Sequence, residues 1–201
     1  MSSPVDDVRV LRAIAHPVRN RILGELDAVG PLRAADVAAR LGIPANQASF
    51  HLRQLAKYGL VEEDPEAARD RRDRVWRSVD SDGLMIDIGR LADVPGGAAA
   101  TRVYLGAAAA EAHRLVDAAY AGPDGSPRGV HSSTSDDRLL LSSEEARQLR
   151  EELVALLDRW REKGRSVAAD GVERRTYVHH SMLLPRPEPV SDAGPEAEGE
   201  D

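Results

Sequence analysis

Side chains that can read DNA bases are concentrated between residues 44 and 58. Within this stretch Ala48, Leu52 and Leu55 recur at i, i+4 and i+7, which is the spacing of one apolar helix face. The remaining positions carry amides, a hydroxyl, a phenyl ring and positive charges: Asn46, Gln47, Ser49, Phe50, Arg53, Gln54 and Lys57. In the major groove an amide pairs with adenine and a guanidinium with guanine, while cations also contact phosphates. The stretch therefore predicts a helix that binds double-stranded DNA.

A second group of basic residues lies in a polar loop between two short apolar stretches, a pattern that favours a β-hairpin. From this loop we expect Arg71, Arg72 and Arg74 to reach a neighbouring groove or the DNA backbone. The loop holds as many acidic as basic residues, so DNA contact depends on which way the arginines face. The alternative is a loop that is merely solvated.

The elements that must position these residues follow from apolar periodicity and from Gly and Pro punctuation. We expect helices over residues 4–15, 17–29, 33–41 and 44–58, and short strands over 60–61 and 74–79. Ser3 is the expected cap of the first helix, and Gly42 separates the third helix from the fourth. This order is the winged helix-turn-helix arrangement, so the predicted fold class is mainly α with a small β component (α+β).

Three stretches of this region form a recognisable combination: AIAHPVRNRIL, AADVAARLGIPANQASFHLRQLAKYGLV and RVWRSV. Together they resemble the DNA-binding domain of ArsR-type winged-helix transcriptional repressors, which are bacterial. The resemblance covers about residues 5–80, some 40% of the chain. It implies a homodimer that binds a palindromic or pseudo-palindromic operator, with half-sites about one helical turn apart.

Three departures from the family pattern qualify this resemblance. Metal-sensing members use cysteine-rich sites, and this chain has no cysteine, so a thiolate sensor of arsenic or cadmium is excluded. Arg33 or Ala34 stands where the family often has a Ser or Thr cap on the third helix, which predicts a weaker cap. Phe50 replaces a commonly polar residue, and either touches a thymine methyl or folds back onto the protein.

The second half of the chain resembles the C-terminal extensions of some actinobacterial-type winged-helix regulators. An alanine-rich helix over 98–120 is expected to mediate dimerisation, and a helix over 142–163 begins with a capping box of Ser142 and Glu145. Strands are expected over residues 129–133, 138–141 and 172–184. The predicted organisation is a winged-helix domain over 1–82, a dimerisation helix and small α/β accessory layer over 83–184, and a disordered acidic tail over 185–201.

Some residues invite either a structural or a functional interpretation. We expect His16 to form a hydrogen bond at a helix junction, and His51 to serve in packing or in a phosphate contact. His179 and His180 would point to opposite faces of a strand, although His113 or His131 could join one of them and a carboxylate around a metal. We favour no metal site. The apolar face from Leu149 to Trp160 is expected to be core or dimer interface rather than a ligand-binding surface.

Composition excludes other classes of protein. Nothing in the sequence matches a phosphate-binding loop, a zinc-protease motif or a nucleophile elbow, so we expect neither enzymatic activity nor a cofactor. The polar N-terminus is not a signal peptide, and no apolar run could span a membrane, which favours a cytoplasmic protein.

The net charge is −7, yet residues 1–92 carry 14 basic and 14 acidic residues and are neutral. Two alternatives stay open: a protein-interaction module that does not bind DNA, and a regulator gated by a small molecule.

Overall fold

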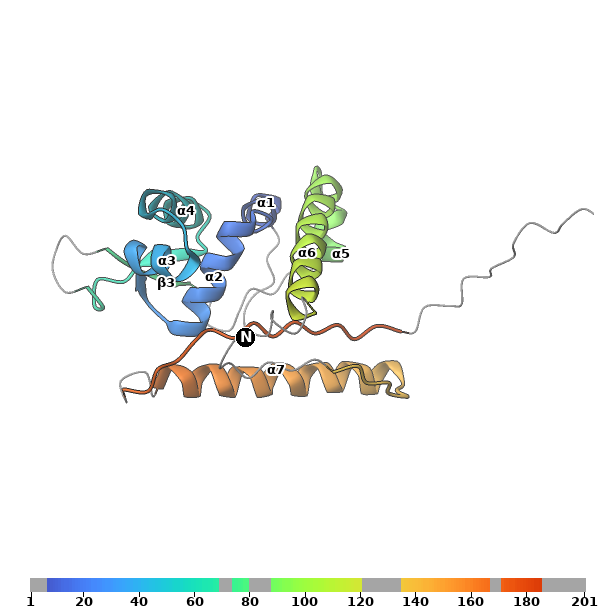
Figure 1. Ribbon diagram of the computed structural model, residues 1–201. Helices are drawn as coiled ribbons and strands as arrows, with labels where there is room; N and C mark the ends of the chain where they lie inside the picture. The colour runs from blue at the N-terminus through green and yellow to red at the C-terminus, as the bar shows by residue number, and fades with distance from the viewer. Residues whose placement is uncertain (1–6, 69–73, 80–87, 121–134, 167–170, 186–201) are drawn as a thin grey trace, which may run out of the picture.

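The computed structural model describes residues 7–68, 74–79, 88–120, 135–166 and 171–185 (Figure 1). Its helices are α1 (Val8–Ile14), α2 (Pro17–Val29), α3 (Ala34–Leu41), α4 (Ala45–Lys57), α5 (Ile88–Ala92), α6 (Gly97–Ala119) and α7 (Ser143–Ser166). Its strands are β1 (Leu32–Arg33), β2 (Val61–Glu63) and β3 (Val75–Ser78). The predicted winged helix-turn-helix class, mainly helical with a small antiparallel sheet, is confirmed.

Local capping explains where the first two helices begin. Asp7 caps α1 by accepting a hydrogen bond from the backbone N–H of Arg9 at 2.7 Å. The helix therefore starts later than the sequence predicts, and Ser3, its expected cap, lies outside the described residues. At the start of α2, Nδ1 of His16 accepts from the N–H of Val18 at 3.2 Å, and Pro17 occupies the first turn. His16 is thus the helix-junction residue that the sequence predicts.

The turn between α3 and α4 depends on one left-handed residue. Gly42 has a φ of 64°, and the N–H of the next residue, Ile43, donates to the carbonyl of Ala38 at 3.1 Å. At the start of α3 no hydroxyl cap is present. Instead, the carboxylate of Asp36 accepts the backbone N–H of Arg33 at 3.2 Å and two guanidinium N–H groups at 2.8 and 2.9 Å. This guanidinium contact lowers the pKa of Asp36.

The small sheet has the strand order β1-β3-β2, and both pairings are antiparallel. The predicted hairpin is confirmed as β2 and β3, with Glu62 opposite Arg77. The sequence did not predict β1, because Leu32 and Arg33 form a strand only through their pairing with Trp76 and Val75. Trp76 is 5% exposed, so the central strand anchors the hairpin to the core.

One hydrophobic core joins the helix-turn-helix to the helices that follow it. Leu11, Ile22 and Leu52 lie at its centre and are fully buried. Leu91 of α5 and Ala100 of α6 belong to the same core, although both lie after residue 82. α6 thus begins as part of the N-terminal core, and it packs along α1.

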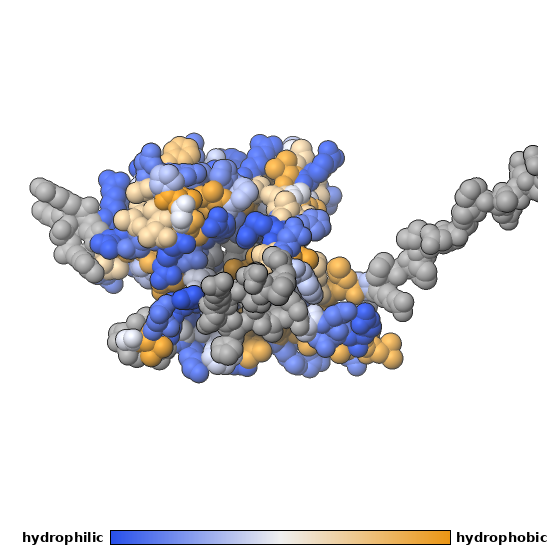
Figure 2. All heavy atoms as spheres, in the orientation of Figure 1, coloured by the Kyte–Doolittle hydropathy of each residue, from blue (hydrophilic) through white to orange (hydrophobic). Residues whose placement is uncertain are grey.

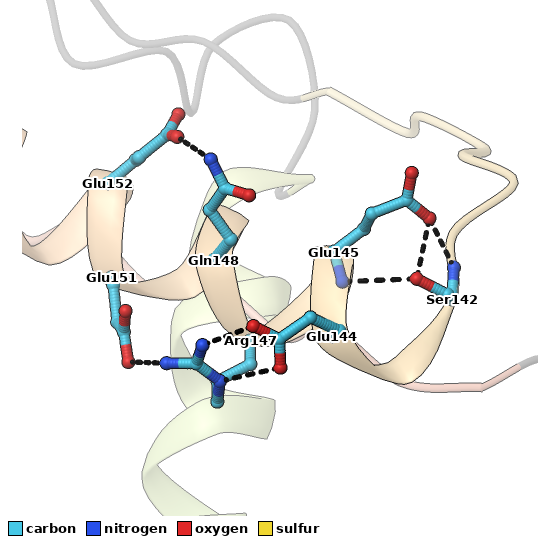
Figure 3. A network of polar contacts seen from close by, with 7 residues as sticks. All are labelled: Ser142, Glu144, Glu145, Arg147, Gln148, Glu151 and Glu152. Atoms are coloured by element: carbon cyan, nitrogen blue, oxygen red, sulfur yellow. Dashed lines mark hydrogen bonds and ion pairs between the residues drawn. The ribbon is translucent and has the colours of Figure 1, made fainter.

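α7 lies along the lower edge of the molecule in Figure 1, and patches of hydrophobic surface occur along that edge in Figure 2. The predicted capping box is confirmed: the N–H of Glu145 donates to Oγ of Ser142 at 3.2 Å, and the N–H of Ser142 donates to the Glu145 carboxylate at 2.7 Å (Figure 3). Arg147 bonds to Glu144 and Glu151 on the same helix. The helix continues past Gly164 to Ser166, beyond its predicted end.

The expected strands in the C-terminal half are wrong where the structure describes them. Residues 138–141 and 172–184 are exposed and form no strand. Alternating apolar residues define two faces but produce a strand only when the backbone pairs with a neighbour, and neither segment has such a pairing. The expected strand over 129–133 and the tail from residue 186 lie outside the described residues.

The left-handed turn gives a direct test of the helix-turn-helix geometry. We expect Gly42→Ala to lower the free energy of unfolding by about 1–2 kcal/mol, because a Cβ disfavours positive φ. Gly24→Ala is the matched control, since Gly24 lies inside α2 and a Cβ there meets nothing within 4 Å. The control should raise the free energy of unfolding by about 0.5–1 kcal/mol. Urea denaturation measures both, and equal effects would contradict the assigned turn.

Candidate nucleic-acid interface

One face of α4 is buried and the opposite face is open to solvent. Ala48, Leu52 and Leu55 are fully buried against the core. Four positions on the opposite face, spaced i, i+4, i+7 and i+11, are exposed: Asn46, Phe50, Arg53 and Lys57. We call these four the outer stripe. An amide, a phenyl ring, a guanidinium and an ammonium group therefore share one side of a 13-residue helix.

The other predicted residues of α4 flank the outer stripe. Gln47, Ser49 and Gln54 are half-buried along its sides. At the helix start, Oδ1 of Asn46 accepts from the N–H of Gln47 at 2.9 Å, and no side chain caps the helix from Pro44. The amide groups of this first turn thus lie at an exposed, uncapped helix N-terminus, where partial positive charge accumulates.

The hairpin is placed beside this helix, but part of its positive charge is already paired. Arg74 lies 3.6 Å from Glu63, and Arg77 lies 2.6 Å from Glu62, with all four side chains largely exposed. Arg71 and Arg72 lie outside the described residues. Of the three predicted hairpin contacts, the structure therefore places only Arg74, and it shares its charge with a neighbouring carboxylate.

Behind the outer stripe, two imidazoles meet where α4 packs on the junction of α1 and α2. The ring centroids of His16 and His51 are 4.6 Å apart. His51 is 5% exposed, so its side chain serves in packing, and its Nδ1 has no hydrogen-bond partner within the described part of the chain. The sequence indicated each histidine separately but not their contact, because 35 positions separate them.

Both imidazoles are kept neutral by their surroundings. Burial lowers the pKa of His16, and the nearby guanidinium of Arg19 lowers it further. Burial also lowers the pKa of His51, with smaller contributions from His16 and Arg19. Arg19 is held in place because its Nε donates to the carbonyl of Ala13 at 2.5 Å. The side chains that support α4 from behind thus form a half-buried cluster that disfavours added positive charge on the imidazoles.

Other candidate sites do not assemble in the described residues. There, no group of three or more His, Asp or Glu side chains is arranged to hold a metal ion. His113, His179 and His180 are exposed, and His131 lies outside the described ranges. Across the same ranges, no helix has the length and hydrophobicity to cross a membrane.

Comparison with known proteins agrees with this geometry. Residues 14–64 match the family model of a helix-turn-helix domain. The chain contains a helix-turn-helix domain. The match runs from the end of α1 through α4 to the first residue after β2, and it covers the whole outer stripe. No curated protein matches the chain. A helix-turn-helix domain indicates a DNA-binding regulator.

The contact between the half-buried His16 and the buried His51 predicts that the stability of the domain falls in acid. An unfolded histidine has a pKa near 6.5, and folding lowers this value for His16 and His51. Below about pH 6.5 the unfolded chain binds more protons than the folded one, so the free energy of unfolding falls as the pH decreases. We expect the melting temperature to be lower at pH 5.5 than at pH 7.5.

A matched pair of variants assigns this effect. His16→Asn keeps a side-chain acceptor for the N–H of Val18 but removes one titrating ring, so it should reduce the loss of stability on acidification. His113→Asn removes an exposed histidine on α6 and should melt with the pH dependence of the wild type. The same pH dependence in all three proteins would disprove the role of the buried pair.

Proposed function

We propose that this chain is a sequence-specific DNA-binding transcriptional regulator of the ArsR-type winged helix-turn-helix class, and that it acts as a repressor. The observation that carries the proposal is the outer stripe, which is presented by the second helix of a helix-turn-helix and backed by a buried apolar face. Arg53 and Lys57 are long cations with no ion pair among the described residues, so their N–H donors are open to a ligand, as is the exposed amide of Asn46.

We infer the role of each residue from the chemistry of the major groove. Arg53 reads guanine, the amides read adenine, and Phe50 contacts a thymine methyl, since its ring is 50% exposed instead of being folded into the core. Lys57 and the N-terminal amides of α4 bind phosphates. The full proposed DNA-contacting set is Asn46, Gln47, Ser49, Phe50, Arg53, Gln54, Lys57, Arg71, Arg72 and Arg74.

The regulator is proposed to act as a homodimer, with residues 1–82 binding DNA and α6 within residues 83–184 joining the two copies. α6 extends well past the core, and three of its large apolar residues, together with the C-cap residue Tyr120, are exposed: Val103, Leu105 and Val116. A two-fold dimer presents two recognition helices to one operator, which requires an inverted repeat in the DNA.

The first test is the base-reading role of Arg53. Sites would be selected by the full chain from a pool of randomised DNA duplexes, and affinities measured by fluorescence anisotropy. Arg53→Ala should weaken binding to the selected site by about 1–3 kcal/mol, which is about 5- to 150-fold. It should also relax the base preference at one position of the site. Arg138→Ala is the control, because Arg138 is an exposed arginine outside the winged helix that pairs with Asp136. Equal affinities of Arg53→Ala and the wild type would remove Arg53 from the interface.

The second test concerns the phosphate contact and the symmetry of the site. Lys57→Ala should lower the affinity for all duplexes by a similar factor. It should also reduce the slope of log affinity against log salt concentration by about one. The selected sequences should contain an inverted repeat whose half-sites are about 10 base pairs apart. A selection that enriches no sequence would instead favour the protein-interaction module, which is supported by the pairing of Arg74 and Arg77 with carboxylates.

A further inference from the structure

α7 carries a heptad pattern that the DNA-binding domain does not use. The residues that share this line along the helix are spaced by three and four positions in strict alternation: Ala146, Leu149, Leu153, Leu156, Trp160 and Lys163. Such a spacing is the a and d pattern with which one helix packs along another in a coiled coil. We call this line the α7 seam.

The C-terminal half of the α7 seam is open to solvent in the described structure, whereas Ala146, Leu149 and Leu153 are half-buried. None of the residues of α7, all of which are described, is buried, and Leu156 and Trp160 are 40% and 60% exposed. The helix packs chiefly on α2, and it is tied there near its C-terminal end, where Nε of Arg165 donates to the carbonyl of Asp27 at 3.0 Å. A helix of 24 residues extends about 36 Å, so most of the seam lies away from this contact.

We propose that the α7 seam binds the same seam of a second copy of this chain, with the two helices antiparallel. The charges at the two ends of α7 favour a second α7 as the partner and an antiparallel orientation of the two helices. The first turn carries Glu144 and Glu145, whereas the last turn carries Lys163 and Arg165. Antiparallel pairing brings each acidic end to a basic end and opposes the two helix dipoles. Parallel pairing would instead place Lys163 opposite Lys163 of the second copy.

The seam also fits itself layer by layer in this direction. When Leu153 lies opposite Leu156 of the second copy, Leu149 lies opposite Trp160, and the small Ala146 lies opposite the long Lys163. The flanks of the seam then pair Glu152 with Arg159 of the second copy, twice by symmetry. A single register thus matches size and charge along the whole helix.

The position of α7 sets the consequence for DNA binding. α4 and α7 lie at opposite sides of the molecule, with α2 between them (Figure 1). Copies joined through the α7 seam therefore present their α4 helices in different directions, so the seam links α6-joined dimers that hold separate DNA segments. This consequence rests on the proposed DNA binding, whereas the self-association itself does not.

The mass of the full chain in solution tests the seam without DNA. In sedimentation equilibrium, Leu156→Glu should halve the mass measured for the wild type at the same concentration. Val154→Glu is the matched control, because Val154 is 47% exposed on the same helix but lies off the seam. Circular dichroism checks that both variants keep their helices. A wild type and a Leu156→Glu variant of equal mass would overturn the proposal, as would an equal loss in the control.

A charge exchange tests the direction of the two helices. Glu152→Arg and Arg159→Glu should each lower the mass, because each places like charges opposite one another, and the double variant should restore it. In a parallel pair Glu152 faces Leu157 instead, so failure of the double variant to restore the mass would overturn the antiparallel arrangement.

A bridging assay separates this inference from the proposed function. The wild type should retain a free, labelled duplex of the selected sequence on beads that carry a second copy of that duplex, and Leu156→Glu should bind the duplex but not bridge it. Bridging by Leu156→Glu would overturn the inference. Loss of DNA binding by every variant would count against the proposed function, while the mass measurements would still decide the seam.

Discussion

The architecture depends on the burial of one face of α4. Ala48, Leu52 and Leu55 are fully buried against α2 and α3, and this packing determines which side chains of the same helix face outward. Because a helix has 3.6 residues per turn, burying these three positions exposes Asn46, Phe50, Arg53 and Lys57 together. The turn at Gly42 and the contact of Asp36 with Arg33 hold α3 in the orientation that makes this burial possible. Recognition chemistry and core packing are thus two consequences of one helical periodicity.

The histidine contact behind α4 limits the pH range in which the domain is stable. The half-buried ring of His16 contacts the buried ring of His51 where α4 meets the α1–α2 junction, and Arg19 bonds to the end of α1 beside them. Two neutral imidazoles are compatible with that guanidinium, whereas a protonated one adds charge in a place that water reaches poorly. We therefore expect the stability of the junction that supports α4 to depend on pH. The hairpin is anchored differently, through Trp76 and the two-residue strand β1.

The two halves of the chain are stabilised by different means. The N-terminal half and the start of α6 share one apolar core, in which Leu91 and Ala100 belong to the same cluster as Leu52. α7 has no buried residue and instead carries a capping box and ion pairs along its own surface (Figure 3). Interactions within a helix contribute only about 0.2–0.5 kcal/mol per pair, so a helix of this kind gains most of its stability from packing. We propose that α7 gains this packing from a second copy, along the seam that includes the exposed Leu156 and Trp160.

The sequence by itself determined the elements whose signals are local. Helical periodicity, the left-handed Gly42, the proline at the start of α2 and the capping box of Ser142 and Glu145 each act within a few residues, and the helices follow them closely. It also identified the polar face of α4, because the spacing of the apolar residues was enough to predict the opposite, apolar face. Only the tertiary structure decided features that need a distant partner. β1 exists through Trp76 and Val75, His51 is buried against His16, and Leu91 joins a core that began at residue 10. The segments at 138–141 and 172–184 show the converse, since both are apolar enough to suggest a strand but neither pairs with a neighbouring strand. Contacts between residues far apart in the chain leave no periodic pattern in the sequence, so only the folded structure shows which of these residues meet.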